Sequence, residues 1–499
     1  MAIQITNTLS GKKEPFVPLE PGKVRMYVCG PTVYGLTHIG NARPVVFFDV
    51  VRRHLESRGF HVTFVSNYTD VDDKIIKRAK EESVDSAVVS EKYIVEFRKD
   101  MDGIGVRAPD KTPKVTDFIP QIVTFIEGLI AKEAAYVALS GEVFYAVRKF
   151  AGYGKLSGKR IDDLLVGVRV EADEKKRDPL DFSLWKPRKT ADEPAWDSPW
   201  GKGRPGWHIE CSAMALELLG ESFDLHGGGL DLQHPHHENE LAQSEALTGK
   251  PFVKYWMHNN LLSIGDTKMS KSLGNFFLNR DFVAKFGSET LKFLLLNAHY
   301  RSPIDFSVDS IAQSQGGLHR IYSALRRASD FAKVDAPEAP LNSEETRLAE
   351  FAALFEESWK SALDEDFNTA KPIASVFDYV RLVNSAADKR KTKPTKAFVE
   401  GMQTFLTNIA ALGNIVNLFE ASPQEFLQGL RRQVLAERGI EPATVDAALA
   451  LRIEARAKKD FAAADALRNE WLAKGVEFRD NPQGSEWDVV FTEKPKETE

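Results

Sequence analysis

A single stretch near the N-terminus, VRMYVCGPTVYGLTHIGNAR (residues 24–43), limits the folds open to this chain more than any other. The apolar run Val24–Val28 predicts a buried strand, and the Cys-Gly-Pro sequence that follows it predicts a turn. A helix is expected next, with its body ending in the segment Val45–Leu55, and the sequence HVTFVSN (residues 61–67) then alternates like a second strand. This order of strand, helix and strand predicts a parallel sheet in an α/β fold of the Rossmann type.

The turn between the first strand and the helix has the features of a phosphate site. His38, Gly40 and Asn41 fall where the turn enters the helix. The first N–H groups of a helix have no partner within it and lie at the positive end of its dipole, which suits an anion. With Cys29 and His38 on the rim of the turn, we expect a ligand site at this end of the sheet.

Further along the chain, turn residues and apolar periodicity predict more elements of an α/β fold. We expect the helices 72–99, 119–132, 209–219, 236–246 and 288–296, a hairpin over 135–147, strands over 223–226 and 253–258, and a glycine turn at 227–229.

The chain has 499 residues, more than one hydrophobic core normally holds, so we expect several domains. Between Gly152 and Pro205 the periodic pattern gives way to polar, Pro- and Trp-rich sequence, which indicates an insertion into the first domain. After Pro303 the pattern is almost wholly helical, typical of a bundle, and the tail predicts two helices and a short β-ribbon. The expected ranges are 1–115 and 206–262 for the two halves of the Rossmann-like domain, 116–205 for the insertion, 263–310 for a connecting region, 311–439 for the helical bundle and 440–499 for a small C-terminal α+β domain.

Composition excludes some classes of protein. Charged residues make up 28% of the chain and hydrophobic residues 43%, which is typical of a globular protein, and the apolar runs are too short to cross a membrane, so we expect a cytoplasmic protein. The net charge of −6 argues against a uniformly basic nucleic-acid binder. The two cysteines, Cys29 and Cys211, are not expected to form a disulfide in a reducing compartment. They are either unrelated buried thiols or ligands of one metal.

A candidate metal site combines these cysteines with the sequence PHHENE (residues 235–240). His236 and Glu240 are spaced i and i+4, so both point from one face of a helix. Two thiolates, an imidazole and a carboxylate match Zn²⁺ better than Mg²⁺. The alternatives are that 236–240 is a solvated polar helix face, or that a bound zinc has only a structural role.

A second candidate phosphate site is the sequence DTKMSKSLGN (residues 266–275). Lys268 and Lys271 supply mobile point charges on a loop with Gly and Ser, which suits a polyphosphate, although a solvated loop would have the same composition. The sequence FDLHGGGLDL (residues 223–232) adds glycines that allow close backbone approach, among them Gly229, and an Asp231 placed to accept hydrogen bonds from ribose.

Taken in order, HIGN (38–41) and KMSKS (268–272) resemble the two signature motifs of class I aminoacyl-tRNA synthetases. With Cys29, GWHIEC (206–211) and PHHENE, the whole chain is similar to the cysteinyl-tRNA synthetase family. One position departs from the motif, because Asn41 stands where the first motif ends in His. An asparagine can still donate a hydrogen bond there.

The resemblance implies ATP-dependent activation of L-cysteine to cysteinyl-adenylate, followed by transfer to tRNA(Cys). It implies that Cys29, Cys211, His236 and Glu240 bind Zn²⁺ with the substrate thiolate as a fifth ligand, and that Mg²⁺ arrives with ATP. It also assigns catalysis to His38, Asn41, Lys268 and Lys271, ATP binding to Gly40, Gly229, Asp231 and Lys271, and contacts with the substrate cysteine to Thr69 and Trp207. A helix-capping Thr69 and a buried Trp207 are the alternatives for the last two.

By the same resemblance, the connecting region would contact the tRNA stem, the bundle would bind tRNA, and the C-terminal domain would bind the anticodon. Basic clusters at 326–327, 389–393 and 452–459 could meet phosphates or be solvated helix faces. Trp487 could stack on a base or fill the small core. We expect a monomer. The rival functions are a cysteine ligase of mycothiol synthesis, which lacks the C-terminal part, and a non-catalytic nucleic-acid-binding relative.

Overall fold

The computed structural model describes residues 2–161, 163, 176–264, 267–268, 277–389, 393–481 and 484–491. Its central sheet is parallel, with the strand order β10 (Val253–Asn259), β9 (Phe223–Gly229), β3 (Lys23–Val28) and β4 (His61–Val65). Helix α1 (Ile39–Ser57) connects β3 to β4, which confirms the predicted strand–helix–strand unit and the α/β fold. Both faces of β3 are covered, since Met26 and Tyr27 are fully buried on opposite sides.

The glycines at 227–229 form part of strand β9, so the predicted turn is wrong at this place. Their small size serves packing: a Cβ on Gly227 would lie 2.0 Å from the ring of Phe48 on α1. A Cβ on Gly228 would lie 3.0 Å from His237. Glycine therefore lets α1 and the segment with His237 approach the sheet closely.

Two of the predicted helices differ from the structure by more than one or two residues at an end. The stretch 72–99 is split into α2 (Asp73–Glu82) and α3 (Ser86–Ile104), because Ser83 adopts a left-handed conformation and Asp85 caps the second helix. The helix expected over 236–246 is divided, because residue 236 lies in the short π-helix η4 (Gln233–His237), which leads directly into α7 (Glu238–Thr248). The 3-10 helix η3 (Leu230–Leu232) precedes η4.

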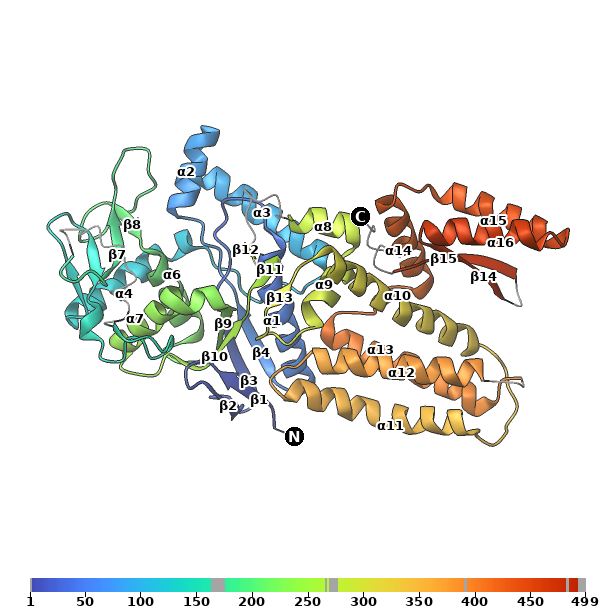
Figure 1. Cartoon of the computed structure of the whole chain (residues 1–499). Helices are drawn as coiled ribbons and strands as arrows, with labels where there is room; N and C mark the ends of the chain where they lie inside the picture. The colour runs from blue at the N-terminus through green and yellow to red at the C-terminus, as the bar shows by residue number, and fades with distance from the viewer. Residues whose placement is uncertain are drawn as a thin grey trace.

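The region between β4 and β9 adds an antiparallel sheet at one end of the molecule (Figure 1). It contains η1 (Val115–Phe118), α4 (Ile119–Ala131), β5 (Ala135–Val137), β6 (Val143–Tyr145), η2 (Val147–Lys149), β7 (Phe182–Pro187) and β8 (Gly203–Pro205), and α6 (Trp207–Leu219) follows it. The turn of the predicted hairpin, between β5 and β6, contains Gly141 at φ +79°. Tyr145 and Trp185 pack in the same core as Met214 of α6, so this sheet shares the interior of the parallel-sheet domain.

The N-terminal hairpin, β1 (Gln4–Asn7) and β2 (Lys12–Pro15), lies beside β10 and was not predicted. After β10 come β11 (Leu262–Ile264), β12 (Thr267–Lys268), α8 (Asn279–Phe286), α9 (Ser288–Leu296) and β13 (Ile304–Asp305). Strand β11 pairs with both β12 and β13.

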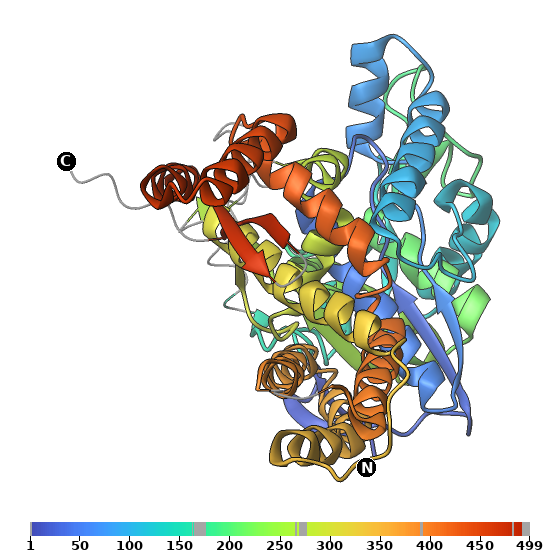
Figure 2. The ribbon, with the colours of Figure 1, turned by 90° about the vertical axis from the view of Figure 1, so that its right-hand side faces the viewer.

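The C-terminal half is helical, as predicted. The bundle consists of α10 (Val308–Phe331), α11 (Ser343–Asp364), α12 (Ala370–Asp388) and α13 (Lys396–Val416), and it lies on the opposite side of the sheet from the insertion (Figure 1). The bundle shares one apolar core with α1 and α9. It is followed by α14 (Pro423–Glu437), α15 (Pro442–Ala457), α16 (Phe461–Ala473), β14 (Val476–Asn481) and β15 (Gly484–Val489). Figure 2 shows this last unit above the bundle. The predicted domain ranges stay predictions.

Several side chains of the predicted basic clusters have structural partners. Arg452 is buried and binds both carboxylate oxygens of Asp480, at 2.8 and 2.9 Å. Lys389 pairs with Glu344 at 2.9 Å, while residues 390–392 lie outside the described part. Trp487 packs against the small C-terminal core and donates to Asp446 at 2.7 Å. Within the described residues, no helix combines the length and apolar character that crossing a membrane requires.

Candidate metal and nucleotide site

The four predicted metal ligands come from four different segments at the carboxyl end of the sheet. Cys29 directly follows β3, and Cys211 lies in the second turn of α6. His236 belongs to the π-helix η4, and Glu240 lies in the first turn of α7. The structure therefore brings together residues that are separated by up to 211 positions in the sequence.

The distances among the donor atoms are those of a compact cluster. Cys29 Sγ lies 3.8 Å from Cys211 Sγ, 3.5 Å from His236 Nε2 and 3.4 Å from Glu240 Oε1. His236 Nε2 and Glu240 Oε1 are 2.9 Å apart, a hydrogen-bond distance. One donor atom from each of the four residues lies within 4.8 Å of all the others, so the set can hold a metal ion. Cys29 is partly exposed and the other three are buried, which gives the cluster an open side at Cys29.

A second group of donors overlaps the first. Cys29 and Glu240 are also within 4.8 Å of donor atoms of His226 and His237, both fully buried. His226 Nε2 lies 2.9 Å from Glu240 Oε2, and His237 Nδ1 lies 2.8 Å from His258 Nε2. Since the two groups share two residues, they cannot hold two ions independently. When the first group is considered, His226 contacts Glu240 Oε2, whereas Glu240 Oε1 faces Cys29 and His236.

The charges of the cluster favour a cation. The hydrogen bond from the Cys29 thiol lowers the pKa of Cys211, so its sulfur is the better thiolate. Burial opposes ionisation of Glu240, but His226 and His236 outweigh it and hold the pKa of this carboxyl well below its ordinary value. Burial likewise opposes the charged form of His236, yet the carboxylate of Glu240 raises its pKa to about 10. The cluster therefore presents anionic donors and one imidazole, and a divalent ion would displace the imidazole proton.

Trp207 and Thr69 lie on two sides of this cluster. Trp207 is the first residue of α6, is 38% exposed, and stacks on His236 with ring centroids 4.2 Å apart. It is therefore not the buried core residue of the alternative interpretation. Thr69 is buried and its hydroxyl lies 3.3 Å from Glu210 Oε2. Helix α2 is capped by Asp72, so Thr69 has no capping role there.

Three residues near the cluster were not predicted. His226 contacts Glu240, and His208 Nδ1 lies 3.0 Å from His236 Nδ1, so both contact side chains of the ligand set. Burial raises the pKa of the Glu210 carboxyl well above its ordinary value, and this group adjoins Thr69. The available signals were that His208 and Glu210 lie beside Cys211 in GWHIEC and that His226 lies within a buried strand, β9.

The first signature motif forms the N-terminus of α1. His38 is the N-cap residue, and its Nδ1 accepts from the N–H of Gly40 at 3.1 Å. Asn41 Oδ1 accepts from the N–H of His38 at 3.1 Å, which completes a capping box. Because these two acceptor atoms are occupied, the other polar atoms of the two side chains, His38 Nε2 and the Asn41 amide nitrogen, are of the donor type. A phosphate oxygen accepts hydrogen bonds, so donor atoms at these two positions suit it.

The chain segment that follows the second signature motif contacts the first motif through its backbone. Lys268 lies in β12, opposite Ser263 of β11. Lys271 lies outside the described residues. On the far side of the motif, the carbonyl of Phe277 accepts from Ile39 N–H at 3.1 Å, directly beside His38. The segment that follows the second motif is therefore tied to the start of α1.

Gly229 and Asp231 lie at the end of β9 and in the following turn η3. A Cβ on Gly229 would lie 2.4 Å from the carboxylate of Asp231, which is exposed. The two residues are thus placed together at the carboxyl end of the sheet, and Gly229 is needed for their close approach.

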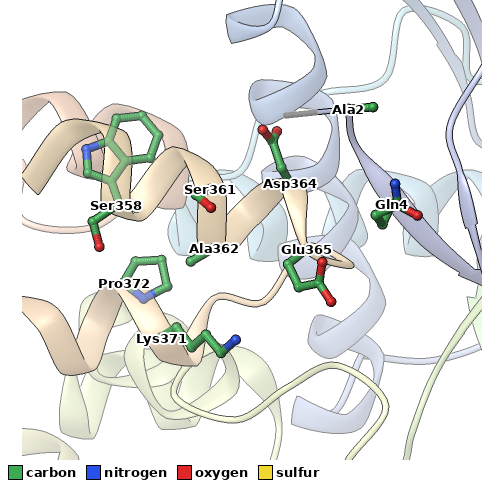
Figure 3. A pocket seen from close by; sticks show the side chains of 10 residues that line it. Ala2, Gln4, Ser358, Ser361, Ala362, Asp364, Glu365, Lys371 and Pro372 are labelled. Carbon is green, nitrogen blue, oxygen red and sulfur yellow. The ribbon is translucent and has the colours of Figure 1, made fainter.

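A cavity of about 640 Å³ lies elsewhere, at the junction of β1 with α11 and α12 (Figure 3). Asp364 and Glu365 lie along it together with Gln4 and Lys371. The Asp364 carboxylate is occupied by His54 at 2.9 Å and Arg58 at 2.7 Å, which are ion-pair contacts between α1 and the bundle. None of the predicted site residues that the structure describes lines this cavity.

Comparison with known proteins agrees with this arrangement. Residues 15–316 match the family described as tRNA synthetases class I (C) catalytic domain, and residues 358–420 match the DALR domain. The chain is 48% identical over 491 residues to the cysteine–tRNA ligase of Pelotomaculum thermopropionicum, covering 97% of this chain and 99% of that relative. It is 46% identical over 489 residues to the cysteine–tRNA ligase of Geobacter metallireducens, covering 98% and 100%.

Among solved structures, the fold is similar to that of Mycobacterium tuberculosis methionyl-tRNA synthetase in complex with methionyl-adenylate. The TM-score is 0.57 at 13% identity, and 84% of this chain and 94% of that chain are covered. This likeness confirms the class I fold, while the full-length matches identify the branch within it. The chain therefore belongs to the cysteine–tRNA ligase family of class I tRNA synthetases.

Proposed function

We propose that this chain activates L-cysteine with ATP, transfers it to tRNA(Cys), and selects cysteine through a zinc ion bound by Cys29, Cys211, His236 and Glu240. The observation that carries the proposal is the cluster of these four donor atoms within 4.8 Å of one another, at the end of the sheet where β3 leads to the HIGN turn. Membership of the family supplies the reaction, and the cluster supplies a physical basis for the choice of amino acid.

The residues present fit zinc in both chemistry and spacing. Thiolate, imidazole and carboxylate are the donors that Zn²⁺ takes in proteins. In a tetrahedral site with Zn–S bonds of about 2.3 Å and Zn–N bonds of about 2.0 Å, two sulfurs lie ~3.8 Å apart and a sulfur and a nitrogen ~3.5 Å apart. The corresponding distances here are 3.8 Å between Cys29 and Cys211 and 3.5 Å between Cys29 and His236.

Zinc would solve a selection problem that shape alone solves poorly. Serine differs from cysteine by one atom, and a pocket that only measures size discriminates weakly between such isosteres. A soft cation, when bound, prefers a thiolate to a hydroxyl as a ligand. The exposed Trp207 covers one side of His236 and would pack against the amino acid. Thr69 and the Glu210 beside it would face its amino group.

The activation step needs little covalent help from the protein. The carboxylate of cysteine attacks the α-phosphate of ATP in line, and negative charge builds on the phosphoryl oxygens. His38 Nε2 and the Asn41 amide would donate to these oxygens, while Lys268 and Lys271 would stabilise the leaving pyrophosphate. Gly40, Gly229 and Asp231 would hold the nucleotide, and Mg²⁺ would arrive with it. The reaction requires no general base.

Transfer to tRNA would use the C-terminal half. Residues 358–420 match the DALR domain, which binds tRNA in this class, and they span the end of α11, α12 and α13. We propose that the protein acts as a monomer in the cytoplasm, where its tRNA substrate is found. Sedimentation would check the monomeric state.

Amino-acid-dependent exchange of labelled pyrophosphate into ATP tests the function. We expect exchange with cysteine and without tRNA, at least ~100-fold less exchange with serine, and formation of cysteinyl-tRNA when tRNA(Cys) is added. Lys271→Ala should slow exchange by about 100-fold while cysteine binding stays unchanged. Lys285→Ala, an exposed lysine of α8, serves as the control. Equal exchange with serine, or full activity of the Lys271 variant, would contradict the respective assignment.

A further inference from the structure

Arg43 is a buried cation that has no assigned role in cysteine binding or adenylate formation. It lies on α1 two residues after Asn41 and is 2% exposed. Within the part of the chain that the structure describes, its hydrogen-bond acceptors are all backbone carbonyls. A guanidinium held only by carbonyl dipoles is unusual, since buried charges are commonly paired with an opposite charge. Burial accordingly lowers the pKa of Arg43 to about 10.

The carbonyls belong to two segments far from α1 in sequence. Arg43 Nη1 donates to the carbonyl of Asn260 at 2.6 Å and that of Leu261 at 2.8 Å. Nη2 donates to the carbonyl of Ser302 at 2.5 Å and that of Tyr300 at 3.1 Å. The planar fork of one guanidinium thus holds two backbone segments at once.

These segments lead directly into the strands that carry the second signature motif. Residues 260–261 precede β11, and residues 300–302 precede β13, which pairs with β11 in parallel. Strand β11 in turn pairs with β12, where Ser263 lies opposite Lys268. Only one strand pairing therefore separates the carbonyls that bind Arg43 from the backbone of Lys268.

At its other end, Arg43 is fixed to the first motif. It follows HIGN within the same helix, whose N-terminus is held by the capping box of His38 and Asn41. A helix transmits position rigidly over two residues. Arg43 is therefore the side chain by which the helix of the first motif holds the base of the second.

We propose that Arg43 is a positioning residue that sets the distance between the HIGN turn and the strand that carries Lys268. The inference rests on the proposed function, because its readout is adenylate formation. It does not concern the metal cluster, so cysteine recognition should be independent of Arg43.

Arg43→Lys tests this role because lysine keeps the charge but not the fork. One ammonium group cannot reach both pairs of carbonyls in their present geometry. We expect the kcat of pyrophosphate exchange to fall by about 10- to 100-fold, as for a misplaced catalytic group. The KM for cysteine and the zinc content should change by less than about twofold, because the cluster is held by other segments. Arg43→Gln removes the charge and serves as a second variant if the lysine variant does not fold.

Arg52→Lys is the matched control. Arg52 lies on the same helix, is 7% exposed, and donates to the carbonyl of Ala108 and to Asp110 and Glu56, all away from both motifs. The Arg52→Lys variant should have a lower Tm in thermal unfolding, but the kcat of its folded fraction should be unchanged. The inference fails if Arg43→Lys and Arg43→Gln keep full kcat, or if their losses follow the folded fraction as in the Arg52 variant. Absence of cysteine-dependent exchange in the unmodified protein would instead refute the proposed function itself.

Discussion

Replacement of His226 by leucine tests how the carboxylate of Glu240, a proposed metal ligand, is held. His226 Nε2 lies 2.9 Å from Glu240 Oε2, while Glu240 Oε1 faces Cys29 and His236. Both His226 and Glu240 are fully buried. The histidine therefore fixes which oxygen of the carboxylate faces the donor cluster, as is usual for residues that orient metal ligands.

The magnitude follows from this single contact. A hydrogen bond to a buried charged group contributes about 1.5–3 kcal/mol. Such a loss corresponds to a decrease in affinity of roughly 10- to 150-fold, because 1.4 kcal/mol is a factor of ten. We expect His226→Leu, which has no donor for Glu240, to raise the dissociation constant for zinc by this factor, measured at pH 7 by competition with a chromophoric chelator.

His258→Leu provides the control for lost ring packing. His258 belongs to the same histidine cluster and stacks on Trp256, as His226 does. It contacts His237 and Thr8, however, and neither is a residue of the proposed ligand set. Its variant should bind zinc within about twofold of the unmodified protein. An unchanged dissociation constant for His226→Leu, or equal losses in both variants, would refute the supporting role of His226.

Three further outcomes are expected. Metal analysis should find no zinc in Cys211→Ser, because the substitution removes one of the proposed ligands. The KM for cysteine in pyrophosphate exchange should rise by at least ~100-fold; an active, metal-free variant would contradict this. Burial opposes ionisation of Asp488, but its hydrogen bond with His319 outweighs burial and lowers the pKa of Asp488 to about 2. The ionised carboxylate therefore stabilises the fold above about pH 4, and this stabilisation is lost as the pH falls toward 2. Asp488→Asn should therefore lower the free energy of unfolding, measured in urea, by about 2 kcal/mol at pH 7. The difference in this free energy between the variant and the unmodified protein should become smaller below about pH 4; a difference that does not change with pH would contradict the lowered pKa of Asp488. Gly227→Ala, with its new methyl group 2.0 Å from Phe48, should cost about 1–3 kcal/mol in the same assay, and an unchanged unfolding midpoint would show that α1 can move aside.

Local sequence signals predicted most elements of the fold but failed where tertiary packing decides. The run Val24–Val28 and the helix after it were predictable from apolar periodicity alone. The glycines at 227–229 indicate a turn by composition, and only the presence of Phe48 above them explains why they continue the strand. The helix break at Ser83 was missed because the amphipathic pattern continues on both sides of it.

The candidate site was predictable to a similar extent. The i, i+4 spacing of His236 and Glu240 indicated that their side chains lie together, and they do. The approach of Cys29 to Cys211, 182 residues away, required the strand order of a parallel sheet in addition. His226 was not found because no spacing relates it to a ligand. Its role depends on the pairing of β9 with β3, which no local pattern specifies.

The most direct test of the account is the X-ray absorption spectrum of the zinc-loaded protein at the zinc edge. Without substrate, we expect two sulfur neighbours at about 2.3 Å and two lighter neighbours at about 2.0–2.2 Å. Addition of cysteine should raise the sulfur count to three, whereas serine should leave it at two. A spectrum without sulfur neighbours, or one that cysteine does not change, would contradict the claim that the metal recognises the amino acid by its sulfur.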